Sequence, residues 1–216
     1  MKAGTTLQGL RFVHHFLAFQ HRTHQYMDKT YLEGEHIKDK NYAEEGFEKG
    51  AYENCTFTNC IFSNVDLSAV NFTDCGFMDC DLSMATLKGT EFRDVTFKNC
   101  KLLGLRFDDC NPFLLSFDFE SCMLNFSSFY RLKIKNTRFE DCKMEQVELV
   151  EADLTNALFQ NCDLQEAVFD NTILDGADLR SALHFSIDPE MNQIYRAKFS
   201  MQNVAGLLHK YKISIT

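Results

Sequence analysis

The stretch from Tyr52 to Leu87 reads YENCTFTNCIFSNVDLSAVNFTDCGFMDCDLSMATL, with Tyr, Phe or Leu at every fifth position. The same period begins at Leu32 and continues to Phe107, then resumes two positions out of phase from Phe119 to Leu179. On an α-helix, steps of five turn about 500° each, so the apolar side chains would drift over every face. On a flat strand they would alternate between the two faces. The period therefore predicts a backbone that turns one corner per repeat and stacks into a solenoid.

A second regularity predicts four corners in each coil. The residue two positions before the large apolar one is usually small, and all nine cysteines occupy this position of the two registers, although Cys110 precedes Pro112 rather than a large apolar residue. The cysteines also recur at twenty-residue intervals, as in the series Cys60, Cys80, Cys100. Twenty residues are four repeats, so these side chains should form ladders along shared faces, about 4.8 Å apart.

The repeat unit, as in Ala152-Asp153-Leu154-Thr155-Asn156 and Ala177-Asp178-Leu179-Arg180-Ser181, resembles that of the pentapeptide-repeat proteins. The resemblance covers about 150 residues of the chain. It implies an all-β fold, a right-handed quadrilateral β-helix, over residues 27–199. A short C-terminal α-helix and tail are expected to follow over residues 200–216.

Nine cysteines could also indicate disulfides or a zinc site. No C-x-x-C pair occurs, and no histidine shares a metal-binding spacing with them. Cysteine is a compact apolar filler when it is buried, so we expect reduced core thiols, no metal, no cofactor and a cytoplasmic location.

Residues 1–26 do not fit the repeat. They contain three bases, four of the seven histidines and no acid, and their apolar run Leu10–Phe19 is too short to span a bilayer. We expect no membrane insertion. The segment is either a floppy or artefactual extension, with Met27 as an alternative start, or a short amphipathic docking helix.

The change of phase indicates an irregularity at residues 108–118, with Asp109, Pro112 and Phe113 at its centre. Pro112 has no N–H for a β-ladder, so it should lie where two additional residues leave the coil. A functional loop and a tolerated insertion are both consistent with this pattern. The apolar residues Phe113, Leu114 and Leu115 favour packing over exposure to solvent.

Near the C-terminus, Ser200 could cap a helix that extends to about Lys210. Its apolar face would comprise Val204, Leu207, Leu208 and Tyr211. Part of this face must cover the last coil, and the rest could pair with a second copy. Capping alone is one interpretation, and capping with homodimerisation, as in Qnr-type pentapeptide proteins, is the other.

No catalytic motif is evident, so we expect no enzymatic activity. Charge is the remaining signal, because residues 145–178 contain nine acids and no Lys or Arg. They follow a basic stretch, Arg131–Lys143. The acids are either a solvated surface or an electronegative binding face that resembles the phosphates of DNA. The candidate partner-binding residues are Glu145, Glu148, Glu151, Asp153, Asp163, Glu166 and Asp170.

The repeat, the apolar C-terminal segment and the acidic C-terminal half together resemble the Qnr-type and microcin-immunity members. That resemblance implies a protein that binds bacterial DNA gyrase or topoisomerase IV as a DNA mimic, without binding nucleic acid itself, and protects the enzyme from quinolones or peptide toxins. Qnr-type proteins often carry two sizeable loops, and this chain has only the short irregularity. The alternative is a structural or adaptor solenoid that binds some other protein.

Overall fold

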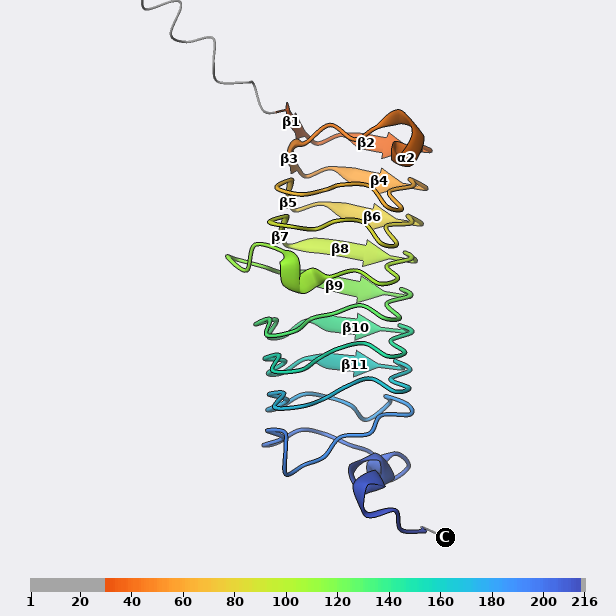
Figure 1. Cartoon of the computed structure of the whole chain (residues 1–216), viewed down its shortest axis with the longest axis vertical. Coiled ribbons are helices and arrows are strands. Elements are labelled where there is room, and N and C mark those ends of the chain that lie inside the picture. Colours follow the sequence, from red (N-terminus) through yellow and green to blue (C-terminus); the bar gives the residue numbers. More distant parts are fainter. Residues whose placement is uncertain (1–29, 215–216) are drawn as a thin grey trace, which may run out of the picture. The chain divides into compact units, whose positions relative to one another are not determined.

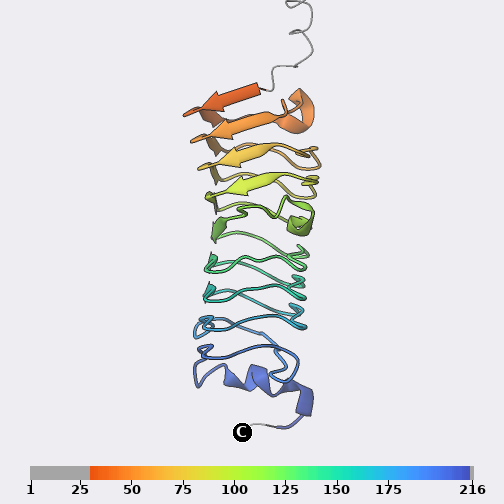
Figure 2. The same cartoon turned by 90° about the vertical axis from the view of Figure 1, so that its left-hand side faces the viewer.

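Each five-residue repeat forms one side of a four-sided coil, and the coils stack into a parallel β-solenoid (Figures 1 and 2). The structure is a computed structural model that describes residues 30–214. Successive coils pair with a twenty-residue register, for example Phe57 with Phe77 and Phe72 with Phe92. The expected right-handed quadrilateral β-helix is therefore confirmed.

We number the four faces of the coil in chain order. Face 1 holds a four-stranded sheet of β1 (Thr30–Glu33), β3 (Gly50–Glu53), β5 (Asn71–Thr73) and β7 (Glu91–Arg93). Face 2 holds a seven-stranded sheet of β2 (His36–Lys38), β4 (Thr56–Thr58), β6 (Gly76–Met78), β8 (Val95–Lys98), β9 (Phe117–Glu120), β10 (Arg138–Glu140) and β11 (Leu158–Gln160).

Faces 3 and 4 are built from single bridges between coils. Face 3 includes the bridge from Lys101 to Met123, and face 4 includes the bridge from Ser128 to Glu148. In the first described coil a short helix, α2 (Tyr42–Glu45), replaces the regular turn between these faces. The uninterrupted period had not indicated this helix.

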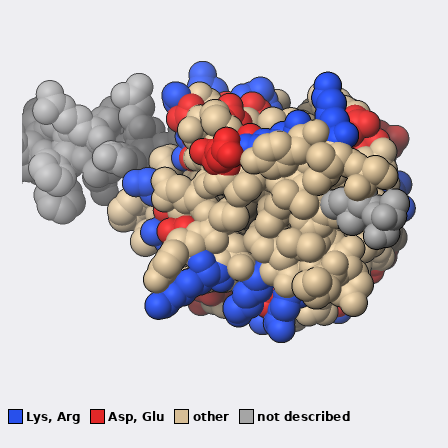
Figure 3. Space-filling model, turned by 90° about the horizontal axis from the view of Figure 1, so that it is seen from below, with Lys and Arg blue, Asp and Glu red and all other residues tan. Residues whose placement is uncertain are grey.

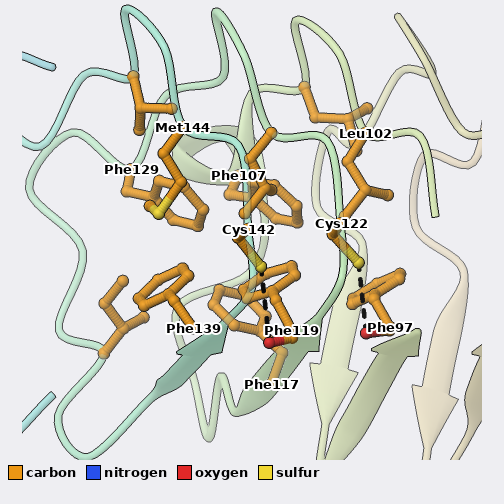
Figure 4. Close-up of a cluster of buried hydrophobic side chains, with 14 of the residues drawn as sticks. Phe97, Leu102, Phe107, Phe117, Phe119, Cys122, Phe129, Phe139, Cys142 and Met144 are labelled. Atoms are coloured by element: carbon orange, nitrogen blue, oxygen red, sulfur yellow. Dashed lines mark hydrogen bonds between the residues drawn. The ribbon is translucent and has the colours of Figure 1, made fainter. Parts of the chain in front are cut away.

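The large apolar side chains point inward and stack along the axis. On face 2 the rings of Phe97, Phe119 and Phe139 are parallel, with centroids 5.4 and 5.2 Å apart (Figure 4). Thiols fill the space beside them, since Cys122 donates to the Phe97 carbonyl oxygen at 3.3 Å and Cys142 donates to that of Phe119 at 3.6 Å. All nine cysteines are buried and free, as expected.

Most corners depend on left-handed backbone two positions after the large apolar residue. The φ angle is 53° at Asn59, 56° at Asp79 and 53° at Asn99. Asn and Asp adopt this conformation more readily than other L-residues because their short polar side chains can bond nearby backbone groups. On this corner Asn59 Nδ2 also donates to Asp39 Oδ1 of the preceding coil, at 2.6 Å.

The change of phase in the sequence corresponds to a loop that protrudes from face 1 of the coil. The Asn111 N–H still bonds the Thr90 carbonyl in the twenty-residue register, whereas Val95 pairs with Phe117, 22 residues later. A 3-10 turn, η1 (Phe107–Asp109), precedes the loop. The expectation that Phe113 and Leu114 pack inward is wrong, because their exposed fractions are 65% and 62%.

Only Leu115 of that apolar triplet packs against the core. The physical reason is that two additional residues exceed the side length of the coil, and Pro112 offers no N–H to the ladder. The Phe113 ring instead contacts the Arg93 guanidinium, with 5.9 Å between ring centroid and Cζ. Asp109 remains in the ladder, where its carbonyl accepts from Gly89 N at 2.8 Å.

The expected C-terminal α-helix is wrong. Residues 200–212 instead contain two 3-10 turns, η2 (Val204–Leu207) and η3 (His209–Tyr211). Asn203 Nδ2 donates to the Leu179 carbonyl oxygen at 2.7 Å, which holds the segment against the last coil. Gly206, a weak helix former, is buried against Phe185. These tertiary contacts outweigh the helical periodicity.

The expected N-terminal extension, residues 1–26, and the alternative start at Met27 lie outside the described residues. Among residues 30–214, no helix is long and apolar enough to cross a bilayer.

Candidate partner-binding surface

The solenoid gathers most of the candidate acids on two adjacent faces. Because residues twenty apart share a position, Glu145, Asp163 and Glu166 lie on face 3 or its corner with face 4. Residues Glu148, Glu151 and Asp170 lie on face 4 or its far corner. Asp153 is separate from them, on face 1, where it bridges to Lys133.

Several of these acids are compensated by cationic or ionisable side chains. Arg131 contacts Glu151 through two nitrogens, with Nε to Oε2 at 2.7 Å, and this contact lowers the pKa of the Glu151 carboxyl. Lys135 lies 3.1 Å from Asp153, and His184 lies 2.7 Å from Asp163. Partial burial opposes ionisation of Asp153, but hydrogen bonds from Thr155 and Lys135 lower its pKa overall.

The remaining four acids receive only neutral donors. Asn125 Nδ2 donates to Glu145 at 3.1 Å, Ser128 Oγ to Glu148 at 2.7 Å, Gln146 Nε2 to Glu166 at 2.7 Å, and Asn171 Nδ2 to Asp170 at 3.1 Å. Within residues 30–214 none of the four forms a salt bridge. We call Glu145, Glu148, Glu166 and Asp170 the base-free acidic cluster.

The sequence pattern showed the basic stretch Arg131–Lys143 beside the acids but did not predict which acids it would pair with. The compensating Arg131 lies twenty residues before Glu151, which is one coil away. The twenty-residue offset that aligns the cysteines also aligns Arg131 with Glu151, so the sequence contained the signal for this ion pair.

The four predicted dimerisation residues of the C-terminal segment differ in their exposure to solvent. Leu207 packs against the core and Leu208 is half-buried, whereas Val204 and Tyr211 are exposed. Tyr211 also donates its hydroxyl to Glu190 at 3.1 Å. Figure 3 shows a broad uncharged surface at this end, with charged groups mainly at its edge. Other exposed apolar side chains of the last coil and the C-terminal segment are Met191, Tyr195, Met201 and Ile213.

We also searched residues 30–214 for a metal site and for reactive thiols. No cluster of three or more His, Cys, Asp or Glu within residues 30–214 is arranged to hold a metal ion. The thiols face inward, and burial raises the pKa of Cys75 to about 11, so a reactive thiolate is disfavoured at that position.

Comparison with known proteins decides the family. The family described as "Pentapeptide repeat region" matches residues 51–118 and 112–183, which together span more than half of the chain. The chain belongs to the pentapeptide-repeat family. No curated protein sequence matches it.

Solved structures support the same fold for this pentapeptide-repeat protein. A trypsin-treated variant of QnrB1, described as a plasmid-mediated fluoroquinolone resistance protein, is 19% identical with a TM-score of 0.57, over 86% of this chain and 97% of that chain. Full-length QnrB1 is 16% identical with a TM-score of 0.57, over 85% and 100%. At these identities the likeness establishes the fold alone.

Proposed function

We propose that this protein is a non-catalytic, DNA-mimicking partner of a bacterial type II topoisomerase, either DNA gyrase or topoisomerase IV. The observation that carries the proposal is the base-free acidic cluster on faces 3 and 4 of a Qnr-like solenoid. QnrB1 is described as a fluoroquinolone resistance protein, and protection from quinolones or peptide toxins is the corresponding role here.

The charge arrangement supports binding to a cationic groove. Glu145 and Glu166 lie on adjacent coils, about 4.8 Å apart along the axis, a spacing somewhat wider than the ~3.4 Å between successive phosphates of one DNA strand. Their hydrogen-bond donors, Asn125 and Gln146, are neutral and so add no positive charge beside these carboxylates. Such charges attract a basic surface at long range and orient it before contact.

We further propose that two copies pair through their C-terminal ends. The exposed Val204 and Tyr211 lie in the segment that covers the last coil, and a two-fold interface would bury them. Light scattering should show a dimer that Val204→Glu converts to a monomer. A Met78→Glu control on face 2, where Met78 is 40% exposed, should stay dimeric. A wild-type monomer at micromolar concentration would exclude this pairing.

The deciding experiment measures gyrase supercoiling and ciprofloxacin-induced DNA cleavage with added protein, and is repeated with topoisomerase IV. Replacing Glu145, Glu148 and Glu166 together by Gln should abolish the effect of the wild type. The matched control replaces Glu33, Glu53 and Glu120 by Gln, which changes the net charge equally on faces 1 and 2. Equal loss in both variants would assign the effect to net charge rather than to the cluster.

A second candidate function, an adaptor for some other protein, is favoured by the cationic partners of Glu151 and Asp153. These ion pairs interrupt a uniformly DNA-like surface. An adaptor predicts no change in supercoiling or cleavage at micromolar protein. An electrostatic mimic, in contrast, predicts topoisomerase binding that weakens steeply as salt is added.

A further inference from the structure

Two bulky apolar residues occupy the corner between faces 3 and 4. Comparable positions of the solenoid often hold Asn, Asp or Gly, as at Asn64 and Gly104 of this same corner. Here Met84 has φ 58° and Phe126 has φ 63°. Their exposed fractions are 60% and 58%.

This placement is unfavourable for the isolated chain in two ways. Left-handed backbone brings the Cβ of an L-residue too close to the following carbonyl oxygen. Burial of the side chains offsets little of this free-energy cost, because neither Met84 nor Phe126 belongs to the core formed by the described residues, 30–214. Strained backbone that presents an exposed apolar side chain points to a binding role.

The two side chains belong to one continuous column. Met84, Gly104 and Phe126 follow one another on successive coils, linked by hydrogen bonds from Met84 N to Leu103 O (2.9 Å) and from Gly104 N to Asn125 O (3.0 Å). Met84 lies across Gly104, since a Cβ there would fall 2.5 Å from its sulfur. We call Met84, Leu103, Gly104 and Phe126 the apolar corner.

The apolar corner adjoins the base-free acidic cluster. Phe126 N donates to the Glu145 carbonyl oxygen at 2.9 Å. The residue before it, Asn125, holds the Glu145 carboxylate, and Ser128, two residues after it, holds that of Glu148. An exposed aromatic ring is therefore followed, one coil later, by carboxylates that form no salt bridge with any residue in the range 30–214.

We infer that Phe126 is the apolar anchor of the partner interface, with Met84 exposed on the same corner two coils away. It fits a protein surface in which an apolar pocket is flanked by Lys or Arg side chains. This inference rests on the proposed function and makes it more specific. The carboxylates attract and orient the topoisomerase, and burial of the Phe126 ring stabilises the complex. Hot spots of protein interfaces are commonly aromatic residues surrounded by polar groups. DNA itself offers no such ring on its phosphate surface.

The test measures the Kd of immobilised gyrase holoenzyme, or of topoisomerase IV, for the wild type and for Phe126→Asn at several salt concentrations. Asn suits the left-handed backbone, so this variant should unfold at the same temperature as the wild type or higher. We expect binding at least tenfold weaker at every salt concentration, because the lost contact is apolar. The control Ala69→Asn changes another exposed left-handed corner, φ 59°, between faces 4 and 1, and should leave both properties unchanged or raise stability slightly.

Each outcome bears on one of the two proposals. If the wild type binds and Phe126→Asn binds equally well, the anchor is wrong while the topoisomerase proposal stands. A clearly lower unfolding temperature for Phe126→Asn would also overturn the anchor, since the ring would then serve the fold. If the wild type binds neither topoisomerase, the proposed function is wrong, and the anchor, as an interface with that enzyme, is wrong with it.

Discussion

Asn203 Nδ2 lies 2.7 Å from the carbonyl oxygen of Leu179, and this hydrogen bond ties the C-terminal segment to the last regular coil. The same amide donates to the Ala182 carbonyl oxygen at 2.9 Å. A terminal coil otherwise presents backbone carbonyls with no following coil to bond them. One amide side chain thus provides the donor for the Ala182 carbonyl and a second donor for the Leu179 carbonyl, which also accepts from Ala182 N at 3.1 Å.

Replacement of Asn203 by Ala should loosen the segment that covers this end. The buried Ala182 residue would lose the side-chain donor to its carbonyl, at a cost of about 1–3 kcal/mol. Hydrogen exchange of residues 200–214 should accelerate, while exchange on β4 and β6 stays unchanged. The neighbouring Gln202 is exposed, so Gln202→Ala is the control. Unchanged exchange in Asn203→Ala would contradict the anchoring role.

Substitution of Gly206 by Ala should destabilise the same end by overpacking. A Cβ at Gly206 would come within 2.6 Å of the Phe185 carbonyl oxygen, which is backbone and cannot easily move. We expect a loss of about 1–3 kcal/mol in urea unfolding. The comparison is Gly89→Ala, where φ is +69° but no atom lies within 4 Å. Backbone strain there should cost about 1 kcal/mol. A smaller loss at Gly206 than at Gly89 would refute the overpacking.

The buried Cys75 thiol predicts a loss of stability in alkali. Burial raises the pKa of Cys75 to about 11, from an ordinary value of 9.0. Between these values the unfolded chain releases the proton and the folded chain keeps it, so stability is full below about pH 9 and falls as pH rises towards 11. The urea midpoint should drop over this range, with Cys75 alone contributing up to ~3 kcal/mol.

Cys75→Ala should flatten part of this pH dependence, although it lowers stability at neutral pH by leaving a small cavity. Thiol titration at pH 8 should find almost no reactive cysteine in the native protein and all nine after unfolding in urea. Rapid labelling of the folded protein would contradict the inward-facing ladder.

The alternation of Asp39, Asn59, Asp79 and Asn99 on one corner should matter for stability. Each asparagine amide donates to the aspartate of the preceding coil, so neighbouring carboxylates are kept two coils apart. Changing both asparagines to Asp would place like charges on adjacent coils. We expect a loss of about 1 kcal/mol at neutral pH and low salt, reduced by added salt.

The control for this double variant is Asn136→Asp. Asn136 occupies an equivalent left-handed corner, φ 64°, and its Oδ1 accepts from Asn156, so an aspartate there keeps its donor and gains no charged neighbour of the same sign on that corner. Equal losses in the control and in the double variant would show that charge alternation is not the cause.

The sequence alone was sufficient for the solenoid, its twenty-residue coil and its inward thiols. Each of these follows from a short repeat in which Phe, Leu and Cys return at fixed positions, such as Phe57, Cys60 and Phe77. A coil contacts only its neighbours, so the pattern of one repeat largely specifies its own packing.

Three features required the tertiary structure. The turns after Asn203 depend on hydrogen bonds to Leu179, on a coil some twenty residues away, rather than on the local helical period. Phe113 is exposed because the inserted residues exceed the side of the coil. The division of the acids depends on which side chain of the neighbouring coil reaches each carboxylate, as Arg131 reaches Glu151 and Ser128 reaches Glu148. Repetition specifies where the backbone lies, whereas these contacts depend on individual side chains that the repeat does not constrain.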